Sequence, residues 1–427
     1  MQNNAGCKKF KQAHKSIYIR ISMAARKVLI ITNRIPYPLN DGGNLAMQAM
    51  IDGYHNNGWQ VYLLSMNTTR HYLQPALLNT LFTQLYKFEW VDFNNDIKPA
   101  GIIKNFLFSR QAEHAERFYN KEFEHKVTEI LDDFHPDVIQ VESVYLTTYL
   151  PAIRQHSRAV TVLRVHNIEY KIWRDLAEKT SSPFKRTYLL TLAKRLKQFE
   201  IQAWPQYDVV LAITEKDASG MIKHAHVPGI MVAPFGLDLS VIPVPSGREQ
   251  WVGYHIGAMD WIPNRESVEW LLREVWPKLH AAVPSFEFYF AGRKMPEAMA
   301  NLDIPGVHCL MEVPDANAFI ADKKILIVPI MAAGGIRVKI LEAMAAGKIV
   351  ITTPYGIKGI EARAGEHYLS ATTPDDFVRA IQWCMTNKDK ADHMACNARQ
   401  LIQDKYNSTM IIADVITKVE ETLAIKL

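Results

Sequence analysis

Short apolar runs alternate with longer amphipathic segments over most of the chain. Residues 28–32 have the length and aliphatic composition of a buried strand. Residues 264–279 instead repeat apolar side chains at the three- and four-residue spacing of one buried helix face, and Asn264 is expected to cap this helix. The predicted strands are residues 28–32, 60–65, 137–141, 161–165, 208–214, 230–233, 251–257, 286–291, 324–329 and 348–353. The predicted helices are residues 44–55, 184–204, 264–279, 335–346 and most of the chain from residue 374 onward.

This alternation predicts an α/β protein with two Rossmann-like, doubly wound domains that face a central cleft. A segment containing Pro and Gly, residues 242–250, separates two series of strands and helices and is expected to be the linker. The N-terminal domain then covers residues 23–241, and the C-terminal domain covers residues 251–410. Residues 411–427 are predicted to form a last helix that can return to the N-terminal domain.

The net charge of the chain lies in its first 22 residues. The 427 residues contain 49 Lys and Arg and 44 Asp and Glu, for a net charge of +5. Residues 1–22 hold five of these bases and no acid, so the remaining 405 residues hold 44 bases and 44 acids. We expect this basic extension to be disordered. The neutral body argues against nucleic-acid binding, which needs a basic field.

Cysteine content and hydropathy narrow the class of protein further. The chain has four cysteines without metal-site spacing, which predicts a reducing, cytoplasmic setting rather than a disulfide framework. The longest uncharged apolar run, residues 325–336, is shorter than the about 20 residues that a membrane helix needs. No zinc-type cluster and no Asp-x-Asp motif follows a strand, so neither a metal nor a cofactor is expected.

Two candidate binding features follow predicted strands of the N-terminal domain. Gly42 and Gly43 precede a predicted helix, where backbone N–H groups and the helix dipole favour an anion. Their spacing is not the G-x-G-x-x-G of a dinucleotide site, and an ordinary turn would also use such a pair. His166 follows the strand at residues 161–165, at the sheet edge where active-site groups collect. A lone histidine of this kind is also common as a structural residue.

The C-terminal domain contains the segment richest in candidate chemistry, Gly334-Gly335-Ile336-Arg337-Val338-Lys339, followed by Glu342. The glycines form a turn, and Arg337 and Lys339 lie in the first turn of the following helix. Cations there oppose the helix dipole at about 0.3–1 kcal/mol each. A bound diphosphate would offset this cost by using the N–H groups and both cations. Glu342 suits a pair of ribose hydroxyls. Alternatively, the cations are solvated and one of them pairs with Glu342.

Two other charged residues follow predicted strands of the same domain. Arg293 comes after the strand at residues 286–291, where a cation suits a phosphate. Glu361 lies in a loop with Gly356 and Gly359 and is a candidate catalytic carboxylate. Ordinary solvated charges would account for either residue equally well.

In this order the motifs resemble those of the retaining family-4 glycosyltransferases of the GT-B fold. The resemblance spans residues 28–416 and is most specific in Arg337-x-Lys339-x-Leu341-Glu342-Ala343-Met344-Ala345-x-Gly347. Its other elements are the Gly42-Gly43 loop, His166 and residues 257–264. The resemblance implies that the C-terminal domain holds a nucleoside diphosphate sugar and that the N-terminal domain holds the acceptor.

The resemblance also implies roles for individual residues. Glu342 is similar to the second glutamate of the family's E-x7-E motif, which holds the nucleotide ribose. His166 is similar to the active-site histidine near the transferred sugar. Gly42 and Gly43 are similar to the loop that faces the donor phosphates.

Two positions depart from the family pattern. Gly334 stands where the first glutamate is usual, and residues 257–264 lack the usual Arg and Lys. A branch of the family with Gly-Gly-x-Arg-x-Lys shares this pattern. Arg337, Lys339 and Arg293 are therefore expected to neutralise the diphosphate. The contact of the missing glutamate is assigned to Glu361, or to backbone N–H groups near Gly334 and Gly335.

Together with these features, the resemblance implies metal-independent transfer of a hexose-type sugar, with retention, to a hydroxyl of a surface glycan or of a lipid-linked glycan precursor. An anionic membrane is a further expected partner. Residues 164–197 hold nine bases and three acids, and residues 98–110 place apolar side chains between cations. A solvated helix face would give the same pattern. The expected location is the cytoplasm, with peripheral binding to the inner face of the cell membrane. The alternatives are a GT-B sugar-nucleotide epimerase and a non-catalytic nucleotide-sugar-binding protein.

Overall fold

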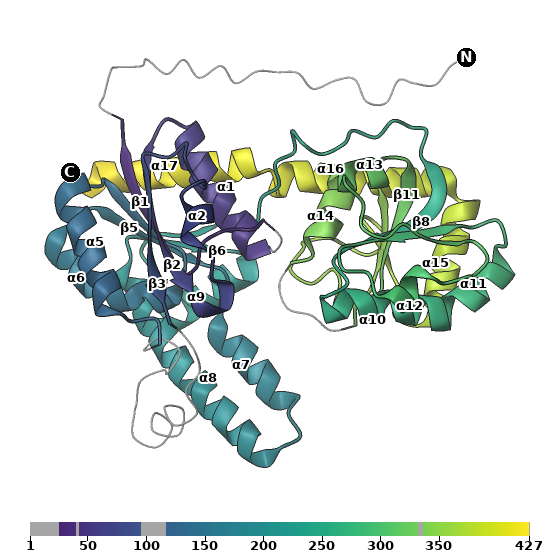
Figure 1. The fold of residues 1–427 in the computed structure, drawn as a ribbon, viewed down its shortest axis with the longest axis horizontal. Helices are drawn as coiled ribbons and strands as arrows, with labels where there is room; N and C mark the ends of the chain where they lie inside the picture. The colour runs from purple at the N-terminus through teal and green to yellow at the C-terminus, as the bar shows by residue number, and fades with distance from the viewer. Residues whose placement is uncertain (1–24, 40–41, 95–116, 332–335, 427) are drawn as a thin grey trace.

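Two parallel sheets, each covered by helices, make up the protein. The computed structural model describes residues 25–39, 42–94, 117–331 and 336–426. Within these residues the first sheet has the strand order β3-β2-β1-β4-β5-β6-β7 and the second has β10-β9-β8-β11-β12-β13. In each sheet the chain starts in the middle and winds outward in both directions. The two sheets and their helices lie side by side (Figure 1). The predicted fold class, with two Rossmann-like doubly wound domains, is confirmed.

The first sheet and its helices come from the N-terminal half of the chain. Its strands are β1 (Lys27–Thr32), β2 (Gln60–Thr68), β3 (Lys87–Phe93), β4 (Val138–Val141), β5 (Val160–Val165), β6 (Val209–Ala212) and β7 (Ile230–Val232). Its helices are α1 (Gly42–Asn56), α2 (Pro75–Leu78), α5 (Lys121–Phe134), α6 (Leu150–His156), α7 (Glu169–Glu178), α8 (Pro183–Ala203) and α9 (Glu215–His224). Short 3-10 turns cover Thr69–His71, Val144–Tyr149 and Trp204–Gln206.

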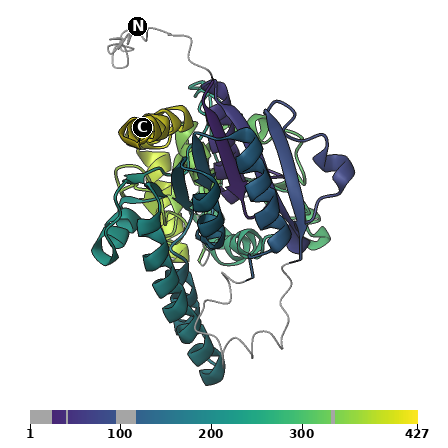
Figure 2. The same cartoon turned by 90° about the vertical axis from the view of Figure 1, so that its left-hand side faces the viewer.

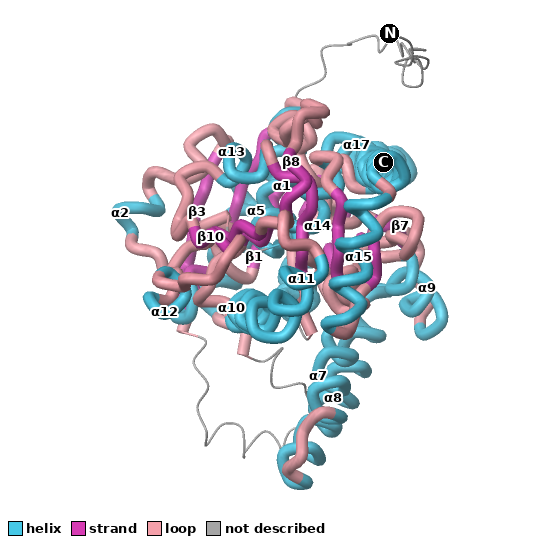
Figure 3. Tube along the Cα trace, turned by 90° about the vertical axis from the view of Figure 1, so that its right-hand side faces the viewer, coloured by secondary structure: helices cyan, strands magenta, loops and turns pink. Residues whose placement is uncertain are grey.

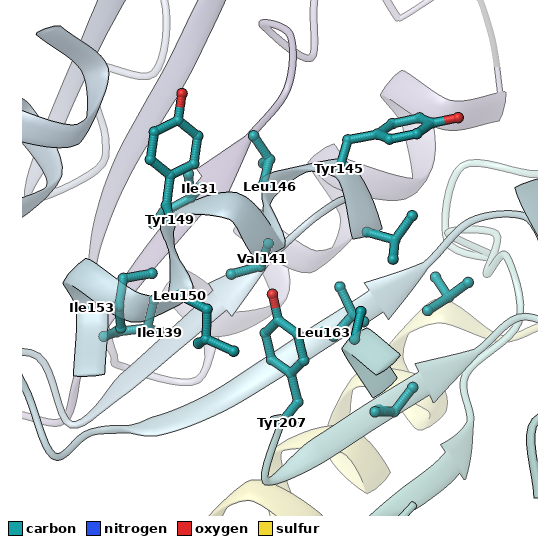
Figure 4. Close-up of a cluster of buried hydrophobic side chains, with 14 of the residues drawn as sticks. Ile31, Ile139, Val141, Tyr145, Leu146, Tyr149, Leu150, Ile153, Leu163 and Tyr207 are labelled. Atoms are coloured by element: carbon teal, nitrogen blue, oxygen red, sulfur yellow. The ribbon is translucent and has the colours of Figure 1, made fainter. Parts of the chain in front are cut away.

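Both faces of this sheet are buried because successive side chains of a strand point to opposite faces. In β1, Leu29 and Ile31 pack on the face covered by α5 and α6. Val28 and Ile30 pack on the face covered by α1 and by the C-terminal helix. Figure 4 shows the first of these clusters, in which side chains of β1, β4 and β5 meet Tyr149 and its neighbours. Burial on both faces explains why the strands are continuous apolar runs.

The second sheet and its helices form the C-terminal domain, which faces the viewer in Figure 3. Its strands are β8 (Gln250–Ile256), β9 (Phe288–Ala291), β10 (Val307–Cys309), β11 (Lys323–Val328), β12 (Ile349–Thr352) and β13 (Leu369–Ser370). Its helices are α10 (Ile262–Trp270), α11 (Trp276–Ala282), α12 (Glu297–Ala300), α13 (Ala316–Ala321), α14 (Val338–Ala345), α15 (Pro374–Thr386) and α16 (Lys388–Lys405). A π-helical segment, Leu271–Val275, joins α10 to α11.

The expectation that Asn264 caps the helix after β8 is wrong. The helix begins two residues earlier, with Trp261 in the cap position and Pro263 in the first turn. Proline is favoured there because its missing N–H has no partner at a helix start and its fixed φ is already helical. The side chain of Asn264 is therefore available for a tertiary contact, and it donates to the carbonyl of Ala258 at 2.9 Å.

The chain crosses between the domains twice, and the two crossings are bonded to each other. The N–H of Leu237 donates to the carbonyl of Tyr406 at 2.7 Å, and the N–H of Ser408 donates to the carbonyl of Leu237 at 2.9 Å. Beyond this point α17 (Ser408–Lys426) packs on α1 of the N-terminal domain. In Figure 1 α16 and α17 run along the same side of the two domains. The C-terminal helix thus belongs to the core of the N-terminal domain.

Helices α7 and α8 form an antiparallel hairpin that projects from the N-terminal domain (Figure 2). At its root, the carboxylate of Glu200 accepts from the N–H groups of Glu169 and Tyr170, at 2.9 Å each. The hairpin begins three residues after His166, at the carboxyl end of β5. Among the helices of the described residues, none is both long enough and apolar enough to cross a bilayer.

Candidate functional site

The start of α14 carries the predicted cations and the predicted ribose carboxylate. Arg337 is the N-cap residue of α14 and is 4% exposed. Lys339 is the second helical residue, and Glu342 lies one turn further on. Gly334 and Gly335, which were predicted to bind the donor, lie outside the described residues.

A buried polar cluster surrounds the side chain of Lys339. Its Nζ donates to Oδ1 of Asn264 at 2.7 Å and lies 3.2 Å from Nε2 of His255. The Nδ1 of His255 lies 2.9 Å from the carbonyl of Ile327, which can only accept. Nδ1 therefore carries the proton, and Nε2 accepts from Lys339. Among the described residues, both hydrogen-bond partners of the ammonium group are uncharged acceptors, so neither of them neutralises its charge.

Burial controls the protonation of this cluster. It lowers the pKa of Lys339 to about 7, an effect that Glu342 opposes and Arg337 reinforces. Burial also raises the pKa of Glu342, against the influence of Lys339. The pKa of His255 falls well below its ordinary value because of burial and because of the cation beside it. A bound anion would stabilise the charged form of Lys339.

The absence of a side chain at Gly257 makes room for this cluster. A Cβ atom at Gly257 would lie 2.5 Å from Nζ of Lys339 and 2.5 Å from Nδ2 of Asn264. Gly257 directly follows β8. Lys339 therefore extends from α14 to the carboxyl end of β8. Residues 257–264 contain no Arg or Lys, and Lys339 places a cation beside them.

The N-terminus of α1 faces the N-terminus of α14 across the domain boundary. Gly42 is the first residue of α1, Gly43 is the second, and Val338 is the first residue of α14. A Cβ atom at Gly42 would lie 3.6 Å from Cγ2 of Val338. The backbone N–H groups of both helix starts can therefore address the same anion. The structure brings together the predicted glycine loop and the predicted cations from opposite domains.

His166 forms a pair with a carboxylate that the sequence analysis did not single out. Its Nε2 lies 2.8 Å from Oε2 of Glu142, which is 1% exposed and directly follows β4. Gln140 also donates to Glu142, and Arg164 lies 3.8 Å from the same carboxylate. Burial alone would raise the pKa of Glu142, but Arg164 and the bond from His166 outweigh it, and the net shift is downward. Glu142 thus stays ionised and orients the imidazole.

Arg293 and Glu361 have partners of their own. The guanidinium of Arg293 lies 3.9 Å from Asp260, which also pairs with Lys294 at 3.3 Å. Arg293 thus lies at the carboxyl ends of β8 and β9, on the same side of the sheet as Lys339. The carboxylate of Glu361 forms an ion pair with Lys405, and its backbone N–H donates to Tyr406. Within the described residues the contacts of Glu361 are with the end of α16 and not with Lys339 or with His166.

Three residues of this arrangement were missed from the sequence. Glu142 is a carboxylate immediately after a buried strand, which is a recognisable pattern. His255 is a polar residue inside an otherwise apolar strand, and it is completely buried. Asn264 was considered only as a helix cap. Glu142 contacts a residue 24 positions away in the chain, His255 one that is 84 positions away and Asn264 one that is 75 positions away. No local sequence pattern reveals contacts at such separations.

A cavity of about 340 Å³ opens on the C-terminal domain, at the end of β11. Its lining includes Pro263, Ser267 and Trp270 of α10, together with Pro329 and Met331. Among the described residues, none of the predicted site residues lines it. It lies beside the segment that carries Asn264, and it is an adjacent hollow rather than the place where the predicted residues meet.

Comparison with known proteins agrees with the fold. In structure, the chain is similar to HepE of Anabaena solved with UDP, with a TM-score of 0.63 and 13% identity over 92% of this chain and 100% of that one. It is also similar to a sucrose-phosphate synthase of Thermosynechococcus elongatus, with a TM-score of 0.61 and 14% identity over 94% and 100% of the two chains. The chain has the GT-B fold.

Sequence comparison points the same way for the C-terminal domain. Residues 252–387 match the family model "Glycosyl transferases group 1". This match covers β8, α14 and the cluster around Lys339. Over nearly its whole length the chain is 22% identical to a protein of Klebsiella pneumoniae described as an uncharacterized 44.6 kDa protein in the cps region, over 91% of this chain and 98% of that one.

Proposed function

We propose that the protein is a retaining glycosyltransferase that moves a sugar from a nucleoside diphosphate sugar to a hydroxyl of a surface glycan or of a lipid-linked glycan precursor. The observation that carries this proposal is the half-buried Lys339, whose hydrogen-bond partners among the described residues are uncharged, at the junction of two helix N-termini. The family match over residues 252–387 supports it, as do the structures of HepE with UDP and with UDP-glucose. A relative in a cps region agrees with a glycan acceptor.

The donor diphosphate would lie between the starts of α1 and α14. Lys339 and Arg337 would neutralise it from α14, with Arg293 at the neighbouring strand end. The backbone N–H groups of Gly42 and Gly43 would approach it from the N-terminal domain. Glu342 would accept hydrogen bonds from the ribose hydroxyls. Because these cations and N–H groups can meet the charge of the diphosphate, we propose that binding needs no metal ion.

In the proposed transfer step, the bond between the anomeric carbon and the diphosphate oxygen breaks. The acceptor oxygen forms the new bond on the same face, and its proton passes to the leaving phosphate oxygen. The cations and helix starts stabilise the charge that develops on the leaving group. The Nε2 proton of His166 is held by Glu142, so Nδ1 is left to accept a hydrogen bond from a sugar hydroxyl. Closure of the two domains would exclude water from the donor.

A binding screen tests the proposal directly. The full-length protein is heated with a panel of nucleoside diphosphate sugars at millimolar concentration, and its Tm is compared with that of the Lys339→Met variant. We expect one nucleotide class to raise the Tm of the wild type and to raise that of the variant much less. If no member of the panel raises the Tm, the donor site is wrongly assigned.

Product analysis with the stabilising donor separates the alternatives. Sugar transfer to a supplied glycan or lipid-linked acceptor, with the anomeric configuration kept, supports the proposal. Rearrangement of the donor without an acceptor would show a sugar-nucleotide epimerase. Binding without any turnover, with the acceptor classes supplied, would show a nucleotide-sugar-binding protein, for which Gly334 in the place of the usual glutamate gives a reason.

A further inference from the structure

The tip of the α7–α8 hairpin combines an exposed aromatic ring with unpaired bases. Phe184, the second residue of α8, is 90% exposed. Lys179, Lys185 and Arg186, here called the tip bases, surround it in the chain and are all exposed. Among the described residues, none of the tip bases has a carboxylate partner. A surface that presents a large apolar side chain between cations is typical of contact with a membrane interface.

The hairpin has an excess of positive charge at its tip because its acidic residues are paired elsewhere. Residues 169–203 contain eight bases and four acids. Two of the acids, Glu169 and Glu200, lie at the root, where they bond to Tyr145 and to the start of α7. The other two, Asp175 and Glu178, both lie within 3.9 Å of Arg174. The four acids of the hairpin thus have partners at its root or on Arg174. Among the described residues, the tip bases and Lys194 form no ion pair with them, so these bases can bind an external anion.

Further exposed apolar side chains lie along both helices of the hairpin, away from its tip. Ile172 and Leu176 on α7 are 46% and 44% exposed, and Leu190 on α8 is 41% exposed. Single exposed apolar residues are ordinary on protein surfaces. Here four of them share the α7–α8 hairpin, whose root packs on the N-terminal domain and whose tip projects from it, as Figures 1 and 2 show.

We propose that the tip of the α7–α8 hairpin docks the protein on an anionic lipid bilayer, with Phe184 inserted among the lipids and the tip bases against the headgroups. Charge complementarity favours an anionic bilayer over a second copy of the protein, because two copies of the same hairpin would bring like charges together. A helix rises about 1.5 Å per residue, so the ten residues of α7 hold the tip roughly 15 Å from the sheet edge that carries His166.

This placement has a consequence for the proposed acceptor. The side of the N-terminal domain that carries His166 would face the bilayer at short range, where a lipid-linked glycan is anchored. That consequence rests on the proposed function, whereas membrane binding itself does not. The two can therefore fail separately.

Vesicle flotation of the full-length protein tests the docking. Vesicles of phosphatidylcholine alone are compared with vesicles that also contain phosphatidylglycerol, in a ratio of about 7:3, at about 0.1 M salt. We expect binding to the anionic vesicles only. Phe184→Ser should weaken partitioning about tenfold or more, and Lys185→Glu with Arg186→Glu should weaken it at least about 25-fold, because each base contributes about fivefold.

Matched control variants make the same kinds of substitution at exposed positions outside the hairpin. Ile222→Ser removes an exposed apolar side chain from α9, where Ile222 is 58% exposed. Arg248→Glu with Lys390→Glu makes the same change of charge at two exposed positions outside the N-terminal domain. Both controls should float with the vesicles like the wild type. All the variants should keep the Tm of the wild type, because the side chains are exposed.

Several results would overturn the docking. One is equal flotation of the hairpin variants and their controls, which would assign membrane binding to another part of the chain. Another is equal binding of the wild type to neutral and anionic vesicles, or no binding to either. A third is a dimer of the wild type, measured by light scattering, that becomes monomeric in Phe184→Ser. This result would show that the hairpin tip binds a second copy of the protein and not a bilayer. Stabilisation by nucleotide sugars, measured on the same variants, reports separately on the proposed function.

Discussion

Nε2 of His166 lies 2.8 Å from Oε2 of Glu142, a carboxylate that is completely enclosed and still holds a lowered pKa. Since an ionised carboxylate only accepts, the imidazole donates from Nε2 and leaves Nδ1 as an acceptor. The pair therefore decides which nitrogen can accept from a sugar hydroxyl. The family resemblance indicates the histidine, and the structure adds the residue that orients it.

Glu142→Gln should lower kcat for sugar transfer about 100-fold and leave the KM for the donor nearly unchanged. The amide can donate to Nε2, which favours the other imidazole tautomer and removes the acceptor at Nδ1. The variant also leaves the buried charge of Arg164 without its partner, so a lower Tm is expected. Steady-state kinetics and nitrogen-15 NMR of the histidine tautomer measure the two effects.

Tyr54→Phe is the matched control for this prediction. Its hydroxyl bonds to Gln140 at 3.0 Å, one step further from His166 in the same network. We expect a stability loss of about 1 kcal/mol and an almost unchanged kcat. If both variants lower kcat in proportion to their loss of stability, the role of Glu142 is structural only.

Lys339→Met should weaken binding of the preferred nucleoside diphosphate about 10- to 100-fold, because a hydrogen bond to a charged group contributes about 1.5–3 kcal/mol. Methionine fills similar volume without the charge, and Asn264 and His255 then face an apolar group. Isothermal titration calorimetry measures the change. Lys358→Met, at an exposed position of the same domain, is the control and should bind like the wild type. Equal affinities for the two variants would remove Lys339 from the site.

Binding of a nucleoside diphosphate should take up a proton above neutral pH. Burial holds the pKa of Lys339 at about 7 in the free protein, and a bound anion favours its charged form. Affinity should therefore fall as pH rises above 7. Calorimetry at pH 8 in buffers of different ionisation enthalpy counts the protons. The second ionisation of a terminal phosphate, at about pH 6, is complete there. Lys339→Met should abolish the uptake, and an unchanged uptake in that variant would contradict the assignment.

The free energy of unfolding should fall between about pH 5 and pH 8 through Glu200. Burial raises the pKa of Glu200 to about 8, although the N–H groups of Tyr170 and Glu169 act against this shift. The folded chain thus holds a proton that the unfolded chain has lost over this window. The slope approaches about 1.4 kcal/mol per pH unit. Denaturant unfolding at several pH values measures it. Glu200→Gln should flatten the slope, whereas Glu178→Gln at the exposed end of α7 should not.

Gly53→Ala should destabilise the protein by about 1–3 kcal/mol, although alanine is the better helix former. A Cβ atom at Gly53 in α1 would lie 2.4 Å from Cγ2 of Ile412 in α17. Denaturant unfolding of Gly53→Ala, Ile412→Ala and the double variant gives their coupling free energy. A favourable coupling, in which the second change offsets part of the first, is expected. Simple additivity would show that α17 is not packed on α1 in solution.

The sequence by itself determined the fold class and most of the strands, but not β3, β10 or β13, nor helices such as α5, α7 and α9. Apolar runs such as Val160–Val165 are strands because parallel sheets are buried on both faces, and the chain order of strands and helices specifies a doubly wound arrangement. The segment around Arg337, Lys339 and Glu342 was also visible, since a glycine turn followed by a helix with cations is a local pattern. These features depend on neighbours in the chain, which is why one sequence reveals them.

Only the tertiary structure decided what these residues contact. The sequence predicts Asn264 as a helix cap, but the helix starts at Ile262, before Pro263, and the side chain of Asn264 accepts a hydrogen bond from Lys339 instead. His255 and Glu142 gained their positions through contacts between strand ends that are far apart in the chain. Gly42 came to face Val338 because the two domains meet there. Local propensity acts over a few residues, whereas the burial that shifts the pKa of Lys339 is created only when distant elements pack together.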